Sequence, residues 1–146
     1  MKPHKRIGLV AHDARKKDMV DWLNASKGYL SPHKLWATGT TGRSIAENTG
    51  LNVTPLKSGP LGGDAQLGAM ICEGELDALI FFSDPLAAMP HDVDVKALIR
   101  LSTLYNIIMA CNRTSADFIV RSPLFSLEYE PQQFNAADYL ARDVGV

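Results

Sequence analysis

The sequence predicts an α/β domain whose parallel sheet is covered by helices on both faces. Short apolar runs rich in Ile, Val, Leu and Phe alternate with longer stretches of helical period, and this alternation is typical of parallel sheets. With 146 residues, 46% of them hydrophobic, the chain is long enough to bury one core. We therefore expect a single domain over residues 1–146 that needs neither a disulfide nor a metal for its stability.

The expected elements follow one another in βα order. The first strand is Ile7–Ala11, and a surface helix is predicted over Ala14–Leu30, where Met19, Trp22 and Leu23 recur at helical spacing. The later expected strands are Lys34–Ala37, Val53–Leu56, Ala78–Phe82 and Ile107–Ala110.

Acidic residues stand where two of the later helices are expected to begin. Asp64 opens one segment of helical period and Asp94 opens another. A carboxylate at a helix start can be an N-cap or complement the helix dipole without any catalytic role, so this interpretation stays open for both. After Pro123 the pattern weakens, and only Ala136–Arg142 is predicted to be helical, within a packed or intersubunit tail.

Charge and hydropathy exclude several classes of partner. Fifteen basic and 16 acidic residues give a net charge of −1, so the chain has no overall basic field of the kind that attracts nucleic acid. No stretch approaches the roughly 20 apolar residues that cross a bilayer, and the apolar run after the basic N-terminus is too short for a signal peptide. We expect a cytoplasmic protein, with Cys72 and Cys111 as reduced thiols in the core.

The polar residues that follow the predicted strands indicate where a ligand binds. The carboxyl ends of parallel strands share one edge of the sheet, and ligands bind there where the strand order reverses. We therefore expect a common site to be built from the turns His12–Lys16, Thr38–Gly42, Ser58–Asp64, Ser83–Pro85 and Asn112–Thr114.

Two of these turns are suited to holding a phosphate. Thr38–Gly42 offers hydroxyls and main-chain N–H groups at a helix start, and Ser58–Asp64 is rich in glycine, which permits close approach of a ligand. Lys16 can add a positive charge. Each feature has an ordinary alternative: a hydroxyl-stabilised turn, a tight turn with an N-cap, and a solvated lysine.

Two of the four histidines are candidates for the same site. His12 and His91 follow the first and fourth strands, which are neighbours if the strand order is 3-2-1-4-5. The ordinary alternative for each is a histidine bonded to a loop carbonyl. A zinc site formed with Asp13 or Asp84 fits no zinc-ligand spacing and is rejected. His4 and His33 lie in polar stretches, where we expect them to be exposed and without a role.

Five motifs stand in order along nearly the whole chain: VAHD at Val10–Asp13, ATGTTG at Ala37–Gly42, SGPLGGD at Ser58–Asp64, FFSDPL at Phe81–Leu86 and PHDVDVKAL at Pro90–Leu98. Together they resemble the methylglyoxal synthase family, in family order. This resemblance implies a three-layer α/β/α sandwich with a five-stranded parallel sheet of order 3-2-1-4-5, a homohexamer, and no organic cofactor or metal. The chain departs from the family at Ser83, where many members carry an aromatic residue, and Arg142 only approximates the family's C-terminal arginine.

By matching motif positions, the resemblance also assigns roles to residues. The catalytic base falls on Asp64, and the histidine that faces the substrate carbonyl falls on His91. Asp13, Asp84 and Asp94 match acidic positions with supporting roles. The contacts to phosphate and substrate fall on His12, Lys16, Thr38, Gly39, Thr40, Thr41, Ser58 and Gly59.

The reaction that the resemblance implies is the elimination of phosphate from dihydroxyacetone phosphate through an ene-diolate, which gives methylglyoxal and inorganic phosphate. A carboxylate in a dry site removes a hydroxymethyl proton, and a neutral imidazole stabilises the negative charge on the carbonyl oxygen. A different class of function stays open, because related domains serve as non-catalytic modules that bind phosphorylated effectors. The presence of Asp64 and His91 beside the predicted phosphate-binding turns favours the enzyme.

Overall fold

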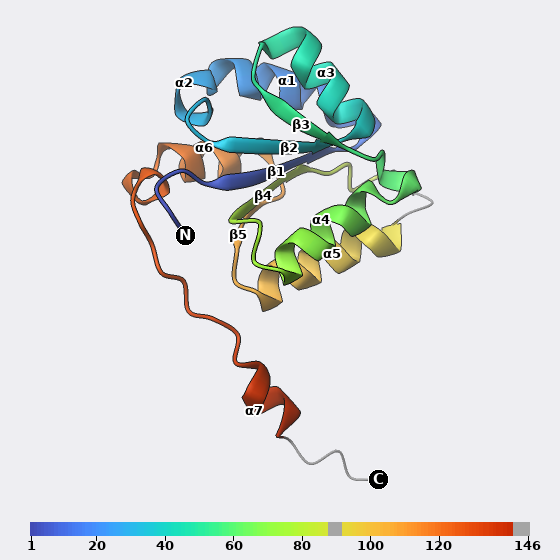
Figure 1. Cartoon of the computed structure of the whole chain (residues 1–146). Helices are drawn as coiled ribbons and strands as arrows, with labels where there is room; N and C mark the ends of the chain where they lie inside the picture. The colour runs from blue at the N-terminus through green and yellow to red at the C-terminus, as the bar shows by residue number, and fades with distance from the viewer. Residues whose placement is uncertain (88–91, 142–146) are drawn as a thin grey trace.

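The computed structural model describes residues 1–87 and 92–141, and over these residues it contains one five-stranded parallel sheet (Figure 1). The strand order is β3-β2-β1-β4-β5, as predicted. Strands β1 and β4 occupy the centre of the sheet, and every neighbouring pair is parallel. The strands are β1 (Arg6–Ala11), β2 (Lys34–Thr38), β3 (Val53–Leu56), β4 (Ala78–Phe82) and β5 (Ile108–Ala110).

Helices cover both faces of the sheet and give the three-layer sandwich (Figure 1). One face carries α1 (Lys16–Ala25), α2 (Lys27–Leu30), α3 (Gly39–Thr49) and α6 (Arg113–Arg121), and the other carries α4 (Gly63–Cys72) and α5 (Asp92–Leu104). Short 3-10 turns precede α1, α4 and the tail: η1 (Asp13–Arg15), η2 (Gly59–Leu61) and η3 (Pro123–Ser126). Within the described residues, no helix is long and apolar enough to span a bilayer.

Strand β4 is apolar at every position because both of its faces are buried. In β4, Ile80 and Phe82 belong to the core beneath α1 and α3, whereas Leu79 and Phe81 belong to the core beneath α4 and α5. Successive side chains of a strand point to opposite faces. The continuous apolar runs of the sequence are therefore explained by two cores, one on each side of the sheet.

Two expectations about the packing are wrong. The helix predicted over Ala14–Leu30 is divided into η1, α1 and α2. The break between α1 and α2 falls at the buried Ser26, whose φ of −107° and ψ of 9° lie outside the helical region. Cys72 and Cys111 are free thiols but are exposed. Cys72 is the last residue of α4 and lies on its solvent side, and Cys111 lies just beyond β5. The apolar runs around the two cysteines in the sequence therefore did not predict whether their thiols are buried.

The C-terminal tail leaves the sandwich after η3 and ends in the short helix α7 (Ala136–Leu140), which stands apart from the sheet in Figure 1. Its first part is attached to the N-terminal segment. The buried Lys5 donates through Nζ to the carbonyl of Leu127 at 2.7 Å, and Met1 and Tyr129 exchange two hydrogen bonds. The tail is therefore anchored near Leu127 and Tyr129.

The ion pair between Arg6 and Asp77 connects the amino ends of β1 and β4. Arg6 donates to the buried Asp77 carboxylate through its main-chain N–H, Nε and a terminal nitrogen, at 2.9–3.0 Å. Burial opposes ionisation of Asp77, but the hydrogen bonds from Arg6 outweigh it and hold the pKa of Asp77 below its ordinary value. The ion pair therefore links the amino ends of these two neighbouring strands.

We expect Asp77→Asn to lower the free energy of unfolding at neutral pH by about 1–2 kcal/mol, because it removes charge-assisted hydrogen bonds from Arg6. The loss is not larger, because the Arg6 side chain is partly exposed and solvent screens its charge. Because the pKa of Asp77 is depressed in the folded state, this stabilisation is present above the unfolded pKa of about 3.9 and is lost as the pH falls through the folded pKa. Denaturant melts from pH 7 to pH 3 measure it.

Asp21→Asn is the matched control, because Asp21 pairs with Lys17 on the exposed surface of α1, where such a pair contributes little. If the difference in the free energy of unfolding between the original chain and Asp77→Asn stayed constant down to pH 3, this would contradict a stabilising role for the ionised Asp77 carboxylate.

Candidate active site

A small cavity of about 90 Å³ lies at the carboxyl ends of β1, β2 and β3. Nine of the predicted site residues line it: His12, Asp13, Lys16, Thr38, Thr40, Thr41, Ser58, Gly59 and Asp64. Sequence reasoning missed its apolar walls, which are Val10, Ala11, Pro60 and Phe81. These four residues lie within the motifs VAHD, SGPLGGD and FFSDPL, so membership of the motifs was the signal that could have identified them.

Two glycine turns interlock beside this cavity. The N–H of Gly39, at the start of α3, donates to the carbonyl of Lys57 beyond β3 at 3.0 Å. The N–H of Gly63, at the start of α4, donates to the carbonyl of Ser58 at 2.9 Å. A Cβ on Gly39 would lie 2.7 Å from the Ser58 nitrogen, and one on Gly63 would lie 2.0 Å from the Lys57 oxygen. No side chain fits at either glycine.

The first turn of α3 forms a cradle of hydroxyls and main-chain N–H groups. Thr38, at the N-cap position, and Thr41 are buried, and the hydroxyl of Thr41 donates to the carbonyl of Ala11. Lys16 reaches this turn from α1 and donates through Nζ to the Thr40 hydroxyl at 2.7 Å and to Asp13 at 2.5 Å. A helix start with an adjacent ammonium group is suited to an anion such as phosphate.

Asp64 is buried at the wall of the cavity, with 3% of its surface exposed. It belongs to the first turn of α4, but the N-cap position is occupied by Gly62, whose φ of 96° suits glycine. The N-cap interpretation of Asp64 is therefore wrong, although the dipole of α4 still favours a negative charge there. A carboxylate with so little water around it, next to an anion cradle, is placed to act as a base.

His12 is held by the exit of β4. Its main-chain N–H donates to the carbonyl of Phe82 at 3.2 Å, and its Nδ1 accepts a hydrogen bond from the main-chain N–H of Asp84 at 2.8 Å. The ring meets Phe81 edge-on, with 5.0 Å between ring centroids. His12 is thus buried and oriented within the cavity wall.

Gly39, Asp84 and Asp94 do not line this cavity. Gly39 lines an adjoining groove with Thr40 and Ser58, and Asp84 contacts the site through its main chain. Asp94 is exposed in the first turn of α5. His91 and Arg142 lie outside the described residues, so the position of His91 opposite His12 stays a prediction.

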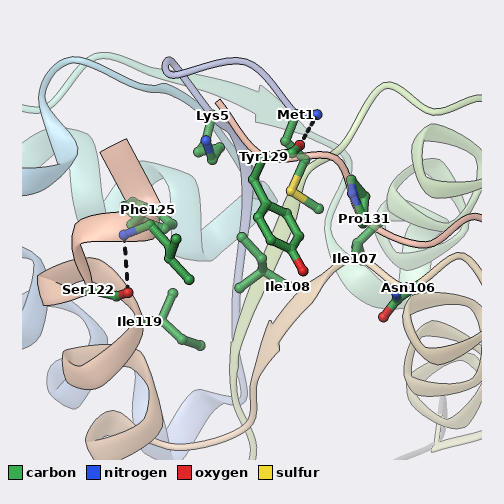
Figure 2. A pocket seen from close by; sticks show the side chains of 11 residues that line it. Met1, Lys5, Asn106, Ile107, Ile108, Ile119, Ser122, Phe125, Tyr129 and Pro131 are labelled. Carbon is green, nitrogen blue, oxygen red and sulfur yellow. Dashed lines mark hydrogen bonds between the residues drawn. The ribbon is translucent and has the colours of Figure 1, made fainter. Parts of the chain in front are cut away.

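A larger hollow, of about 300 Å³, lies at the opposite edge of the sheet, between the amino ends of β1 and β5 and the tail (Figure 2). Its cationic groups bind main-chain carbonyls: Lys5 those of Lys2 and Leu127, and the amino group of Met1 that of Tyr129. No residue predicted for the ligand site lines it. We therefore interpret this hollow as part of the tail anchor.

In the described part of the chain, no group of three or more His, Cys, Asp or Glu side chains is arranged to hold a metal ion. The site instead combines a buried carboxylate, an oriented imidazole and an anion cradle. Fold and site together define an α/β protein built to bind a small phosphorylated molecule beside a carboxylate.

Comparison with known proteins identifies the family. The model of the MGS-like domain matches residues 18–111. The methylglyoxal synthase of Oleidesulfovibrio alaskensis is 52% identical over 97% of this chain and 97% of its own, and that of Leptospira interrogans is 56% identical over 86% and 85%. The crystal structure of methylglyoxal synthase from Elizabethkingia anophelis matches with a TM-score of 0.93 and 48% identity, covering 99% of this chain and 95% of that one. The chain belongs to the methylglyoxal synthase family.

We expect Gly39→Ala to weaken the binding of inorganic phosphate at least about tenfold, because the new Cβ would push the Ser58 backbone away and open the cradle. Calorimetric titration of the purified variant with phosphate measures this, alongside its melting temperature. Gly28→Ala is the matched control, since a Cβ on Gly28 meets nothing within 4 Å. Equal phosphate affinity in both variants would contradict the interlocked turns as the basis of the cradle.

Proposed function

We propose that this chain is a methylglyoxal synthase, a lyase that eliminates phosphate from dihydroxyacetone phosphate and releases methylglyoxal and inorganic phosphate. The observation that carries the proposal is the buried Asp64, which shares one small cavity with Lys16 and the threonine cradle. The relatives named above carry this activity in their names and align with nearly the whole chain.

In the proposed reaction, Asp64 removes a proton from the hydroxymethyl carbon of the substrate. The proton is acidic because the neighbouring ketone accepts the electron pair and forms an ene-diolate. Burial of Asp64 and the apolar walls of Phe81 and Pro60 support this role, since a carboxylate with little hydration is a stronger base. The substrate phosphate, held by the cradle, sets which carbon meets Asp64.

Negative charge then develops on the carbonyl oxygen, and hydrogen-bond donors must stabilise it. We assign the carbonyl-facing role to His91, which follows β4 in sequence and matches the family histidine. His12 is a second imidazole at this edge of the sheet and lines the cavity.

The second half of the reaction expels phosphate from the ene-diolate. The carbon–oxygen bond to phosphate must stand out of the ene-diolate plane, so that the electron pair forms a new carbon–carbon double bond while phosphate leaves with the electrons of the broken bond. The resulting enol gains a proton on its methylene carbon and loses its hydroxyl proton, which gives methylglyoxal. We assign this restraint, and the stabilisation of the departing phosphate, to Lys16, Thr40, Thr41 and Ser58, with Thr38, Gly39 and Gly59 shaping the main chain. Asp13, Asp84 and Asp94 take supporting roles.

A non-catalytic module that binds phosphorylated effectors is the alternative. Such a module requires the cradle but not a buried carboxylate beside it. The position of Asp64 in the cavity wall and the enzymatic names of the relatives favour the lyase.

We further propose a cytoplasmic homohexamer that acts on its substrate without an organic cofactor or metal. The tail supports an intersubunit role, because Phe134, Tyr139 and Leu140 expose apolar surface and the five residues of α7 are too few to form a stable helix alone. One domain spans residues 1–146 in this proposal.

We expect the purified protein to release phosphate and methylglyoxal in equal amounts from dihydroxyacetone phosphate in the presence of a chelator. Phosphate is assayed colorimetrically and methylglyoxal by trapping with a diamine. Phosphate binding without product above the non-enzymatic background would reject the lyase and favour the effector-binding module.

A further inference from the structure

The side chain of His12 faces a group that can only donate. The main-chain N–H of Asp84 lies 2.8 Å from His12 Nδ1. If Nδ1 also carried a hydrogen, two donors would be directed at each other at hydrogen-bonding distance. Nδ1 must therefore present its lone pair, and the hydrogen of the neutral ring must lie on Nε2.

The turn that delivers this N–H is itself held in shape. Asp84 follows the last residues of β4, and its carboxylate accepts a hydrogen bond from the main-chain N–H of Leu86 at 3.1 Å, two residues further along. This is an Asx-turn, in which the side chain replaces a main-chain acceptor. Pro85 adds a second restraint, because a residue before proline is confined to extended conformations. The side chain of Asp84 thus orders the loop that carries its own N–H.

His12 has little freedom to escape this arrangement. Its main chain is tied to the carbonyl of Phe82, its ring packs edge-on against Phe81, and the residue is 7% exposed. Rotation of the ring would remove both the contact with Phe81 and the acceptor of the Asp84 N–H. The exit of β4 therefore controls both the position and the tautomer of His12.

We propose that Asp84 is a positioning residue: its Asx-turn directs its main-chain N–H at His12 Nδ1, which fixes His12 as the Nε2–H tautomer and makes it a hydrogen-bond donor in the cavity. In this state His12 binds an oxygen of the substrate and takes no proton from it, so proton abstraction is left to Asp64. The identity of the oxygen rests on the proposed function. The tautomer does not, because it follows from contacts within the chain.

Nitrogen NMR of histidine-labelled protein tests the tautomer without any substrate. At mildly alkaline pH, long-range proton–nitrogen spectra distinguish a protonated from an unprotonated ring nitrogen. We expect His12 to show a protonated Nε2 and an unprotonated Nδ1, with its signals assigned by their loss in His12→Gln. A protonated Nδ1, or an averaged mixture of tautomers, would overturn the proposal.

Two other histidines serve as references in the same spectrum. His33 Nδ1 accepts from the N–H of Lys5 at 3.0 Å, so it should match His12. His4 Nδ1 lies 3.0 Å from the carbonyl oxygen of Pro32, which can only accept a hydrogen bond. His4 should therefore carry its hydrogen on Nδ1, which is the opposite tautomer to that of His12. His33, which the sequence pattern placed on the surface, is half-buried.

A pair of substitutions tests the turn. Asp84→Asn keeps an oxygen that can accept from Leu86, whereas Asp84→Ala removes it. We expect the Asn variant to retain the Nε2–H pattern, and the Ala variant to show mixed tautomers and a roughly 3- to 10-fold lower kcat/KM, the scale of one displaced neutral hydrogen bond. A pure Nε2–H pattern in Asp84→Ala would overturn the role of the turn, whatever the activity of the protein.

Discussion

The interlock between two glycine turns is the constraint on which the site depends. The turn after β2 meets the turn after β3 where Gly39 donates to Lys57, and within the second turn Gly63 donates to Ser58. The backbones approach so closely that neither glycine has room for a Cβ. This contact brings the hydroxyls at the start of α3 and the carboxylate at the start of α4 to one cavity, although the two segments are far apart in the chain.

The central position of β1 supplies the other half of the site. Because β1 lies between β2 and β4, the turn that follows it can reach both neighbours. Lys16 extends to Thr40 beyond β2, while His12 is held by the loop beyond β4. The turn after β1 thus brings a positive charge to the start of α3 and holds an imidazole in the wall of the same cavity.

The sequence predicted the strands well and the loops poorly, for physical reasons. A fully buried strand leaves a continuous apolar run that needs no knowledge of tertiary contacts, and Ala78–Phe82 was located at its observed bounds. The break at Ser26 and the exposure of Cys72 depend on packing that a periodicity does not encode. The cap position of Gly62 and the bond from Asp84 to His12 arise from loop geometry, which only the structure supplies.

The central claim is that Asp64 is the base, and turnover of Asp64→Asn tests it most directly. The substitution removes the charge and keeps the shape of a side chain that is almost completely buried. The account predicts that the variant folds, binds inorganic phosphate like the original chain, and loses turnover of dihydroxyacetone phosphate by about 10²- to 10⁴-fold, the usual contribution of a general base. Near-normal turnover with unchanged phosphate affinity would contradict the claim and direct the search to Asp94 or Asp13.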